Sequence, residues 1–152
     1  MKRVTMELGG HSPAIICEDA DVKTAVKILS ANKFRNAGQV CISPTRFLVH
    51  DSVYDEFVDG FVKQAESLNV GNGLDEGVKM GPLAHDRRLT AIEDFVADAV
   101  ETGAKILTGG KRKGNKGYFF EPTVMTNVSK ESRIMNEEPF GPLAPINSFS
   151  SI

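Results

Sequence analysis

The chain has 152 residues, 41% of them hydrophobic and 25% charged, a balance typical of one globular domain with a hydrophobic core. Its 18 basic and 20 acidic side chains leave a formal net charge of −2, which gives no reason to expect a nucleic-acid or anionic-membrane partner. No segment reaches the ~18 to 20 apolar residues of a membrane-spanning helix and no apolar signal region opens the chain, so a small-molecule ligand is expected.

The first third of the chain predicts a strand, a helix and a second strand. The apolar runs 13–17 and 46–50 each have the length of a buried strand. Between them, apolar residues recur at helical spacing from Asp21 onward. Either Asp19 or Asp21 is placed to accept the first free amide protons of this helix.

Two further helices are predicted in the middle of the chain, separated by a glycine-rich loop at 70–77. The first begins near Asp51 and has an apolar stripe on one face. That stripe consists of Tyr54, Phe57, Val58, Phe61, Val62, Ala65 and Leu68. The second is expected to end at Gly103, where a left-handed residue is easiest. Its stripe consists of Leu89, Ile92, Val96, Ala99 and Val100.

The remaining segments predict short strands and loops. A strand is expected at 105–107, followed by a solvated basic turn at 109–117, which we interpret as a loop and not as a nucleic-acid site. Short extended segments are expected around Pro122, and a further strand begins at 143–146. Three alternations of strand and helix predict an α/β domain with a mainly parallel sheet flanked by helices.

The two cysteines, Cys17 and Cys41, form neither a Cys-x-x-Cys pair nor part of a cysteine and histidine cluster, so no metal site is predicted. Cys17 lies in an apolar strand and is expected to be a buried packing thiol, whereas His11 is expected at the surface or an interface. Unpaired thiols fit a reducing compartment, and the expected location is therefore cytoplasmic.

Three separated segments contain candidate functional residues: 7–10 (Glu-Leu-Gly-Gly), 36–41 (Asn-Ala-Gly-Gln-Val-Cys) and 137–142 (Glu-Glu-Pro-Phe-Gly-Pro). Each alone also has a structural explanation, as a turn or as a buried thiol. Glu7 precedes Cys41 by 34 residues, and Cys41 precedes Glu138 by 97. In this order and at these separations, the three segments resemble the signature motifs of the aldehyde dehydrogenase superfamily. The resemblance extends over nearly the whole chain.

The resemblance implies an oxidoreductase that converts an aldehyde to a carboxylic acid through a cysteine thioester. Cys41 would be the nucleophile that adds to the carbonyl carbon, and its backbone N–H would stabilise the resulting oxyanion. Glu7 would be the base that activates the hydrolytic water, and it would also help to deprotonate Cys41.

The resemblance also implies a cofactor, NAD or NADP. Glu138 would hold the nicotinamide ribose, and the ring of Phe140 would pack near the nicotinamide. Leu8 and Gly9 would border the same ring, because a glycine has no side chain to block close approach. The residue that distinguishes NAD from NADP lies upstream of the glutamate motif in this family, so both cofactors stay open.

By this resemblance, residues 1–152 would form part of a catalytic domain. In the family, the dinucleotide-binding domain and the asparagine that completes the oxyanion hole lie upstream of the glutamate motif, and the catalytic domain continues beyond the segment present here. We therefore expect the isolated chain to be inactive and to self-associate through uncovered apolar surface, and the parent enzyme to be a homo-oligomer.

The stretch 141–145 (Gly-Pro-Leu-Ala-Pro) looks most like that of succinate-semialdehyde dehydrogenases, which makes succinate semialdehyde a hypothesis for the substrate. One alternative is an acylating dehydrogenase that passes the acyl group to coenzyme A, although the presence of Glu7, which would serve hydrolysis, argues against it. The other alternative is a non-catalytic fragment.

Overall fold

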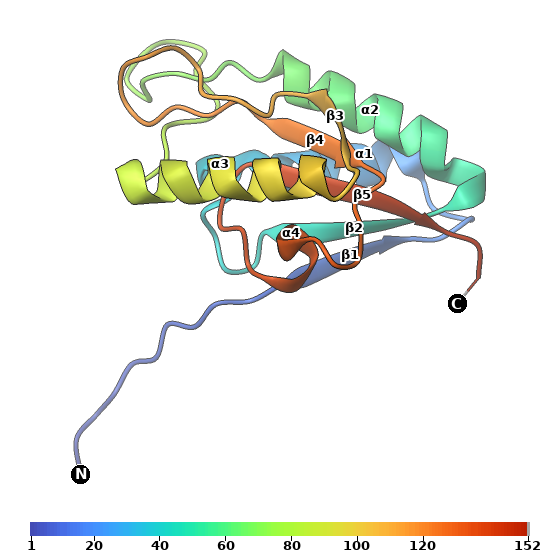
Figure 1. Ribbon diagram of the computed structural model, residues 1–152, viewed down its shortest axis with the longest axis horizontal. Helices are drawn as coiled ribbons and strands as arrows, with labels where there is room; N and C mark the ends of the chain where they lie inside the picture. The colour runs from blue at the N-terminus through green and yellow to red at the C-terminus, as the bar shows by residue number, and fades with distance from the viewer. Residues whose placement is uncertain (152) are drawn as a thin grey trace.

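Five strands form one sheet in the computed structural model, which describes residues 1–151 (Figure 1). Along the sheet they follow the order β1-β2-β5-β4-β3. Their bounds are β1 (Ser12–Ile16), β2 (Pro44–His50), β3 (Lys105–Thr108), β4 (Thr123–Thr126) and β5 (Leu143–Phe149). The pairs β1–β2, β2–β5 and β5–β4 are parallel, and only β3 pairs antiparallel, with β4. The expected mainly parallel sheet is confirmed.

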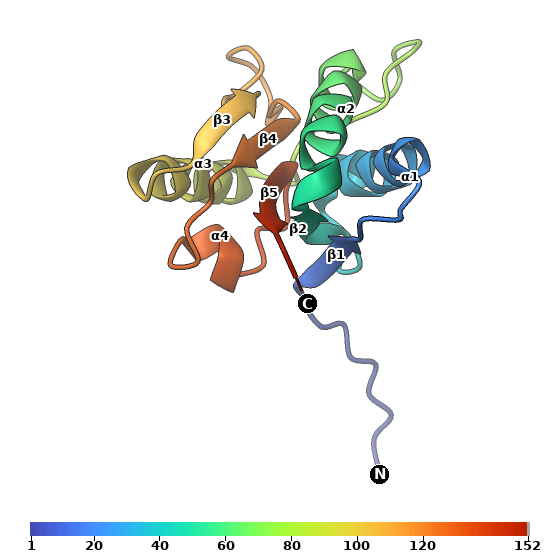
Figure 2. The same cartoon turned by 90° about the vertical axis from the view of Figure 1, so that its right-hand side faces the viewer.

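Helices cover both faces of the sheet, as Figure 2 shows. One face carries α1 (Val22–Phe34) and α2 (Tyr54–Ser67), and the other carries α3 (Asp86–Glu101) and the short α4 (Arg133–Asn136). Two 3-10 turns, η1 (Arg35–Gly38) and η2 (Asp51–Val53), follow α1 and β2. The three long helices lie where the sequence predicts them. Within residues 1–151, no helix is both long and apolar enough to cross a membrane.

The structure decides between two predicted caps at one helix end and differs from the prediction on one helix face. Asp21, and not Asp19, caps α1, because its carboxylate accepts hydrogen bonds from the Thr24 amide at 3.1 Å and the Thr24 hydroxyl at 2.7 Å. In α3, Phe95 is buried, whereas the expected stripe residue Val100 is 50% exposed, because it lies on the flank of the buried face.

The edge strand β3 is antiparallel because the chain reaches β4 through a loop alone. No helix lies between Thr108 and Thr123 to carry the chain across the sheet, and a parallel neighbour requires such a crossover. The basic turn in this loop is held to α3 by a bidentate pair between Arg112 and Glu93, with both N–O distances at 2.6 Å. Its exposed charges therefore belong to a loop anchored on a helix.

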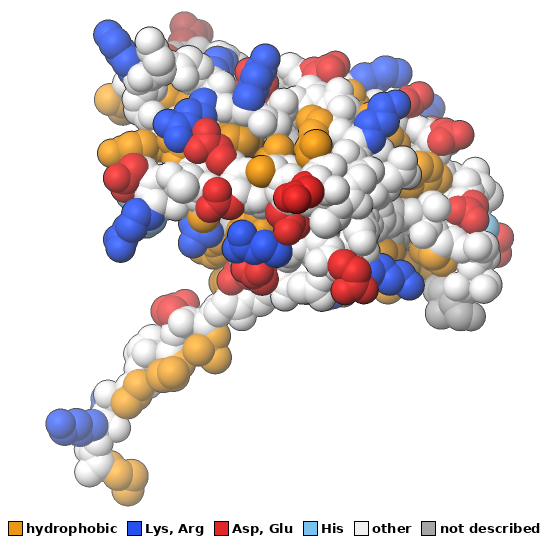
Figure 3. Space-filling model, in the orientation of Figure 1, with side chains coloured by type: hydrophobic (Ala, Val, Ile, Leu, Met, Phe, Trp, Pro, Cys, Tyr) orange, Lys and Arg blue, Asp and Glu red, His pale blue; other side chains and the backbone are white. Residues whose placement is uncertain are grey.

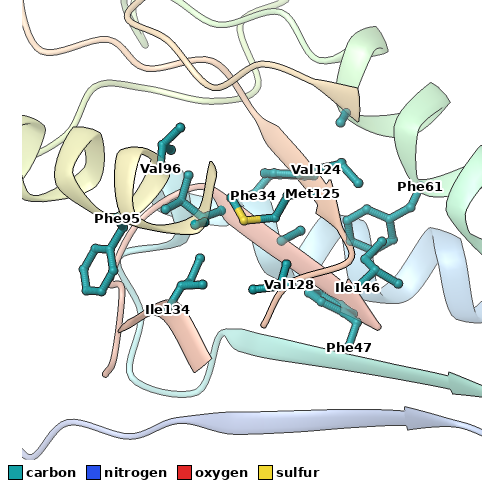
Figure 4. Close-up of a cluster of buried hydrophobic side chains, with 14 of the residues drawn as sticks. Phe34, Phe47, Phe61, Phe95, Val96, Val124, Met125, Val128, Ile134 and Ile146 are labelled. Carbon is teal, nitrogen blue, oxygen red and sulfur yellow. The ribbon is translucent and has the colours of Figure 1, made fainter. Parts of the chain in front are cut away.

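The core packs on both sides of the sheet, and Figure 4 shows part of it. Between the sheet and α1 and α2, four phenylalanine rings meet, with the centroids of Phe47 and Phe61 4.9 Å apart. The four are Phe34, Phe47, Phe57 and Phe61. Phe34 is the last residue of α1, so this packing fixes the point at which the chain leaves α1 for the cysteine segment.

Residues 1–11 precede β1 without a helix or a strand and extend away from the sheet (Figures 1 and 3). Four apolar side chains along this segment are exposed: Met1, Val4 at 73%, Met6 at 68% and Leu8 at 69%. The end of the segment that adjoins β1 contains the predicted site residues Glu7 and Gly9.

Candidate active site

A cleft of about 560 Å³ lies where three separated segments meet: the end of the N-terminal segment, the loop after η1, and the loop between α4 and β5. Its lining consists of Glu7, Leu8, Gly9, Gln39, Val40, Cys41, Arg88, Glu138 and Phe140. All six residues that the sequence assigns to catalysis or cofactor binding therefore border one cleft. Gln39, Val40 and Arg88 are additional.

The cysteine segment begins with three consecutive left-handed residues. After α1 ends, Asn36, Ala37 and Gly38 have φ values of 51°, 53° and 72°. Such a conformation costs a non-glycine residue roughly 1–2 kcal/mol, although asparagine tolerates it better than most. The turn brings Cys41 to the surface, where its thiol is exposed and unpaired. Backbone strain of this kind clusters at functional sites.

Gln39 fastens this turn to the loop that precedes α3. Its side-chain amide donates to the carbonyl oxygen of Asn36 at 3.0 Å and to that of Pro82 at 3.3 Å, while its Oε1 accepts from the Ala84 amide at 2.8 Å. The Asn36 side chain in turn donates to the Gln39 carbonyl at 3.0 Å. These hydrogen bonds offset the backbone strain of the turn. The sequence does not reveal this role of Gln39, because its partners at 82–84 are distant in the chain.

The third segment follows α4 and contains Glu138 and Phe140. Phe140 also has a left-handed backbone, with φ at 45°. Arg88, in the first turn of α3, lies over its ring, 5.7 Å from Cζ to the ring centroid, and donates to the Pro139 carbonyl at 3.2 Å. Arg88 therefore holds the loop that presents Glu138 to the cleft, a role that no local pattern in the sequence indicates.

Gly9 allows the N-terminal segment to lie directly against Glu138. A Cβ built on Gly9 would overlap Oε2 of Glu138 and lie 3.4 Å from its Cδ. On Gly10, a Cβ would lie 3.2 Å from the carbonyl oxygen of Cys41. Because these two residues have no side chains, the segment that contains Glu7 can lie close to the segments that contain Cys41 and Glu138.

Two residues outside the cleft differ from expectation. Cys17 is partly exposed and not a buried packing thiol, because it follows β1 at the point where the chain turns toward α1. His11 is half-buried, with ring nitrogens 2.9 Å from the Thr45 hydroxyl and 3.1 Å from the Ile134 carbonyl oxygen. Among residues 1–151, no three His, Cys, Asp or Glu side chains gather in a metal-binding arrangement.

Replacing Gly38 by alanine is expected to destabilise the chain by about 2 kcal/mol or more, measured by chemical denaturation. A left-handed alanine is itself strained, and its Cβ would overlap the carbonyl oxygen of Gly141. Gly73→Ala is the matched control, because a Cβ there meets no atom within 4 Å. Equal losses of stability in the two variants would contradict the crowding described here.

Comparison with known proteins shows the family of this chain. The family model described as "Aldehyde dehydrogenase family" matches residues 1–152. The chain is 48% identical over 149 residues to a probable NADP(+)-dependent succinate-semialdehyde dehydrogenase of Sinorhizobium fredii, covering 98% of this chain and 30% of that protein. It is 47% identical over 150 residues to the mitochondrial succinate-semialdehyde dehydrogenase of Mus musculus, covering 98% and 29%.

Solved structures show the same family relationship. The crystal structure of succinate-semialdehyde dehydrogenase from Burkholderia pseudomallei superposes with a TM-score of 0.93 at 44% identity, over 97% of this chain and 30% of that one. The chain therefore belongs to the aldehyde dehydrogenase family, and the α/β fold expected from the resemblance is confirmed. It spans about 30% of the length of these relatives.

Proposed function

We propose that this chain is part of the catalytic domain of an aldehyde dehydrogenase that oxidises a small anionic aldehyde, such as succinate semialdehyde, to a carboxylic acid with NADP or NAD. The observation that carries the proposal is the single cleft bordered by Cys41, Glu7 and Glu138. The isolated chain is expected to be inactive, because it spans only about 30% of the length of the relatives that it matches.

The names of similar proteins support an aldehyde with an acidic group at its far end. They include succinate-semialdehyde dehydrogenases, a glutarate-semialdehyde dehydrogenase of Pseudomonas aeruginosa and a 3-sulfolactaldehyde dehydrogenase of Pseudomonas putida. Each of these substrates combines an aldehyde with a carboxylate or a sulfonate. An acidic small molecule is also compatible with a chain whose own net charge is close to zero.

In the proposed reaction, Cys41 attacks the aldehyde. The thiolate sulfur forms a bond to the carbonyl carbon, the π electron pair moves onto the oxygen, and the backbone N–H of Cys41 donates a hydrogen bond to that oxyanion. Loss of the carbon-bound hydrogen as hydride converts this thiohemiacetal into a thioester. Glu7 then accepts a proton from the water that attacks the thioester, the C–S bond breaks, and the thiolate is regenerated.

The residues of the cleft fit a nicotinamide cofactor. When bound, the nicotinamide supplies the hydride acceptor. The Glu138 carboxylate would accept hydrogen bonds from ribose hydroxyls, and Phe140 and Leu8 would pack against the ring. Gly9 would leave room beside it. NADP is favoured because two similar succinate-semialdehyde dehydrogenases are named for NADP(+) and a similar structure was solved in complex with NAP.

The proposed cysteine chemistry and the exposed apolar surface also suggest a cellular location and an oligomeric state. A thiolate nucleophile must stay reduced, and both cysteines are free, so we propose a cytoplasmic enzyme. Exposed apolar residues outside the cleft lining, Val4 at 73% and Ile42 at 72%, would be covered by the remainder of the enzyme or by a second subunit of a homo-oligomer. The isolated chain would self-associate through the same surface.

Replacing Glu7 by glutamine in the complete enzyme is expected to lower steady-state turnover of succinate semialdehyde by about 10²- to 10⁴-fold. A first-turnover burst of reduced cofactor should persist at a lower rate, because Glu7 would also help to deprotonate Cys41, but the thioester still forms and is hydrolysed slowly. Stopped-flow absorbance measures both phases. Glu18→Gln, at an exposed acid outside the cleft, should leave both phases unchanged.

Three results would count against parts of the proposal. Undiminished steady-state turnover in Glu7→Gln would remove Glu7 from the hydrolytic step. Acceleration of the wild-type enzyme by coenzyme A, with an acyl-coenzyme A product, would identify the acylating alternative. A preference for simple alkyl aldehydes over succinate semialdehyde would overturn the proposed substrate class while leaving the cysteine mechanism intact.

A further inference from the structure

Lys33 is a buried cation that the proposed mechanism does not use. It lies in the last turn of α1 and is 0% exposed. Within residues 1–151, its Nζ has no hydrogen-bond partner. Burying an ammonium group without a partner is costly, and an apolar side chain of similar length would fill the same space at lower cost. The presence of a lysine at this position therefore calls for a role outside packing.

The charged groups around Lys33 come from three elements. Glu138, on the loop before β5, is the opposite charge that interacts with it. His11, before β1, interacts with both Lys33 and Glu138, and Arg46 on β2 donates to the His11 carbonyl at 2.7 Å. Burial lowers the pKa of His11, and the positive charge of Arg46 adds to this effect, while the charge of Glu138 opposes it. Glu138 is thus the anion in a group with two cations.

The backbone of Lys33 also lies against two of the three segments that form the cleft. Its backbone carbonyl accepts a long hydrogen bond, 3.5 Å, from the hydroxyl of Ser43, two residues after Cys41. A Cβ on Gly38 would lie 3.2 Å from the same carbonyl oxygen and would overlap the backbone of Gly141, three residues after Glu138. The end of α1 therefore has a fixed position relative to the thiol and to the carboxylate.

We propose that Lys33 is a positioning residue for Glu138, whose carboxylate its buried ammonium attracts and orients from behind the wall of the cleft. Lys33 does not touch substrate or cofactor, because its side chain is fully covered. The effect of Lys33 on cofactor binding rests on the proposed function, in which Glu138 binds the nicotinamide ribose. The charge coupling between Lys33 and Glu138 does not depend on that proposed function.

The coupling can be measured on this chain without any catalytic assay. Burial lowers the pKa of Lys33 to about 7, while the charge of Glu138 opposes that shift. An NMR titration of lysine side-chain amines should show one resonance with a midpoint far below those of the exposed lysines, and Lys33→Met should abolish it. In Glu138→Gln the midpoint should fall by about one further unit, because the favourable opposite charge is lost.

Glu137→Gln is the matched control, since Glu137 is adjacent in sequence but pairs with Arg133 at 2.8 Å. It should leave the Lys33 midpoint unchanged. An unchanged midpoint in Glu138→Gln, or a Lys33 that titrates together with the exposed lysines, would overturn the proposal. This result is independent of whether the protein oxidises aldehydes.

The consequence for cofactor binding is tested in the complete enzyme. Lys33→Met should raise the KM for NADP on the order of 10- to 100-fold, with little change in the KM for the aldehyde, because only the ribose contact is disturbed. In Glu138→Gln, the added Lys33→Met should have little further effect. Additive effects of the two substitutions would show that Lys33 acts independently of Glu138 and would overturn the positioning role.

Discussion

Replacing Cys41 by serine is expected to reduce aldehyde oxidation by the complete enzyme to background, because a hydroxyl at its ordinary pKa is a far weaker nucleophile than a thiolate. The measurement is absorbance of the reduced cofactor, together with mass spectrometry of the aldehyde-treated protein. No covalent adduct should form in the variant. Cys17→Ser is the matched control and should retain both turnover and adduct, because Cys17 lies outside the cleft.

The isolated chain allows a simpler version of this experiment. Cys41 is exposed whereas Cys17 is only partly exposed, so a thiol-directed reagent should modify Cys41 first. Preferential modification of Cys17, or full turnover in Cys41→Ser, would refute the assignment of Cys41 as the nucleophile.

Replacing Lys33 by methionine is expected to stabilise the chain at neutral pH and to flatten the dependence of its stability on pH. Burial lowers the folded pKa of Lys33 from 10.5 to about 7. Between these values the unfolded state binds more protons, so the free energy of unfolding rises with pH, by up to ~1.4 kcal/mol per unit. Below pH 7 both states are protonated and the full cost of burying the charge is present, on the order of several kcal/mol.

Urea denaturation at pH 6, 7, 8 and 9 measures this difference. The gain from Lys33→Met should be largest at pH 6 and shrink toward pH 9, as the wild-type lysine loses its proton in the folded state. Lys27→Met, on the exposed side of the same helix, provides the control and should show no such trend. Parallel stability profiles for wild type and Lys33→Met would mean that Lys33 is not buried as described.

The helices that the sequence predicts correctly are those with a long repeating pattern. Helix α2 contains six apolar residues of the predicted stripe at helical spacing, and its buried residues, such as Phe57 and Phe61, belong to that stripe. In contrast, α4 has only four residues, too few for a period to appear. The antiparallel direction of β3 depends on the segment that connects it to β4, a loop without a helix, and not on the residues within the strand.

The candidate site divides in a similar way. Glu7, Cys41 and Glu138 can be found from the sequence because each belongs to a short motif at a characteristic separation. Arg88 cannot, because its importance lies in a contact with Phe140, and Lys33 cannot, because its importance lies in its burial and in the charge of Glu138, both far away in the chain. A lysine in the last turn of a helix ordinarily interacts with the solvent-exposed carbonyl groups at the helix C-terminus. The position of Lys33 in the sequence therefore predicts solvent exposure and not burial.

The close contact between Gly38 and Gly141 has a mechanical consequence. Main chain meets main chain there with no side chain in between, since a Cβ on Gly38 would overlap the carbonyl group of Gly141. Rotamer changes therefore cannot loosen the joint, and a shift of one loop must push the other. The sulfur that would hold the substrate and the carboxylate that would hold the ribose should move together as one rigid piece, preserving the gap that the hydride has to cross.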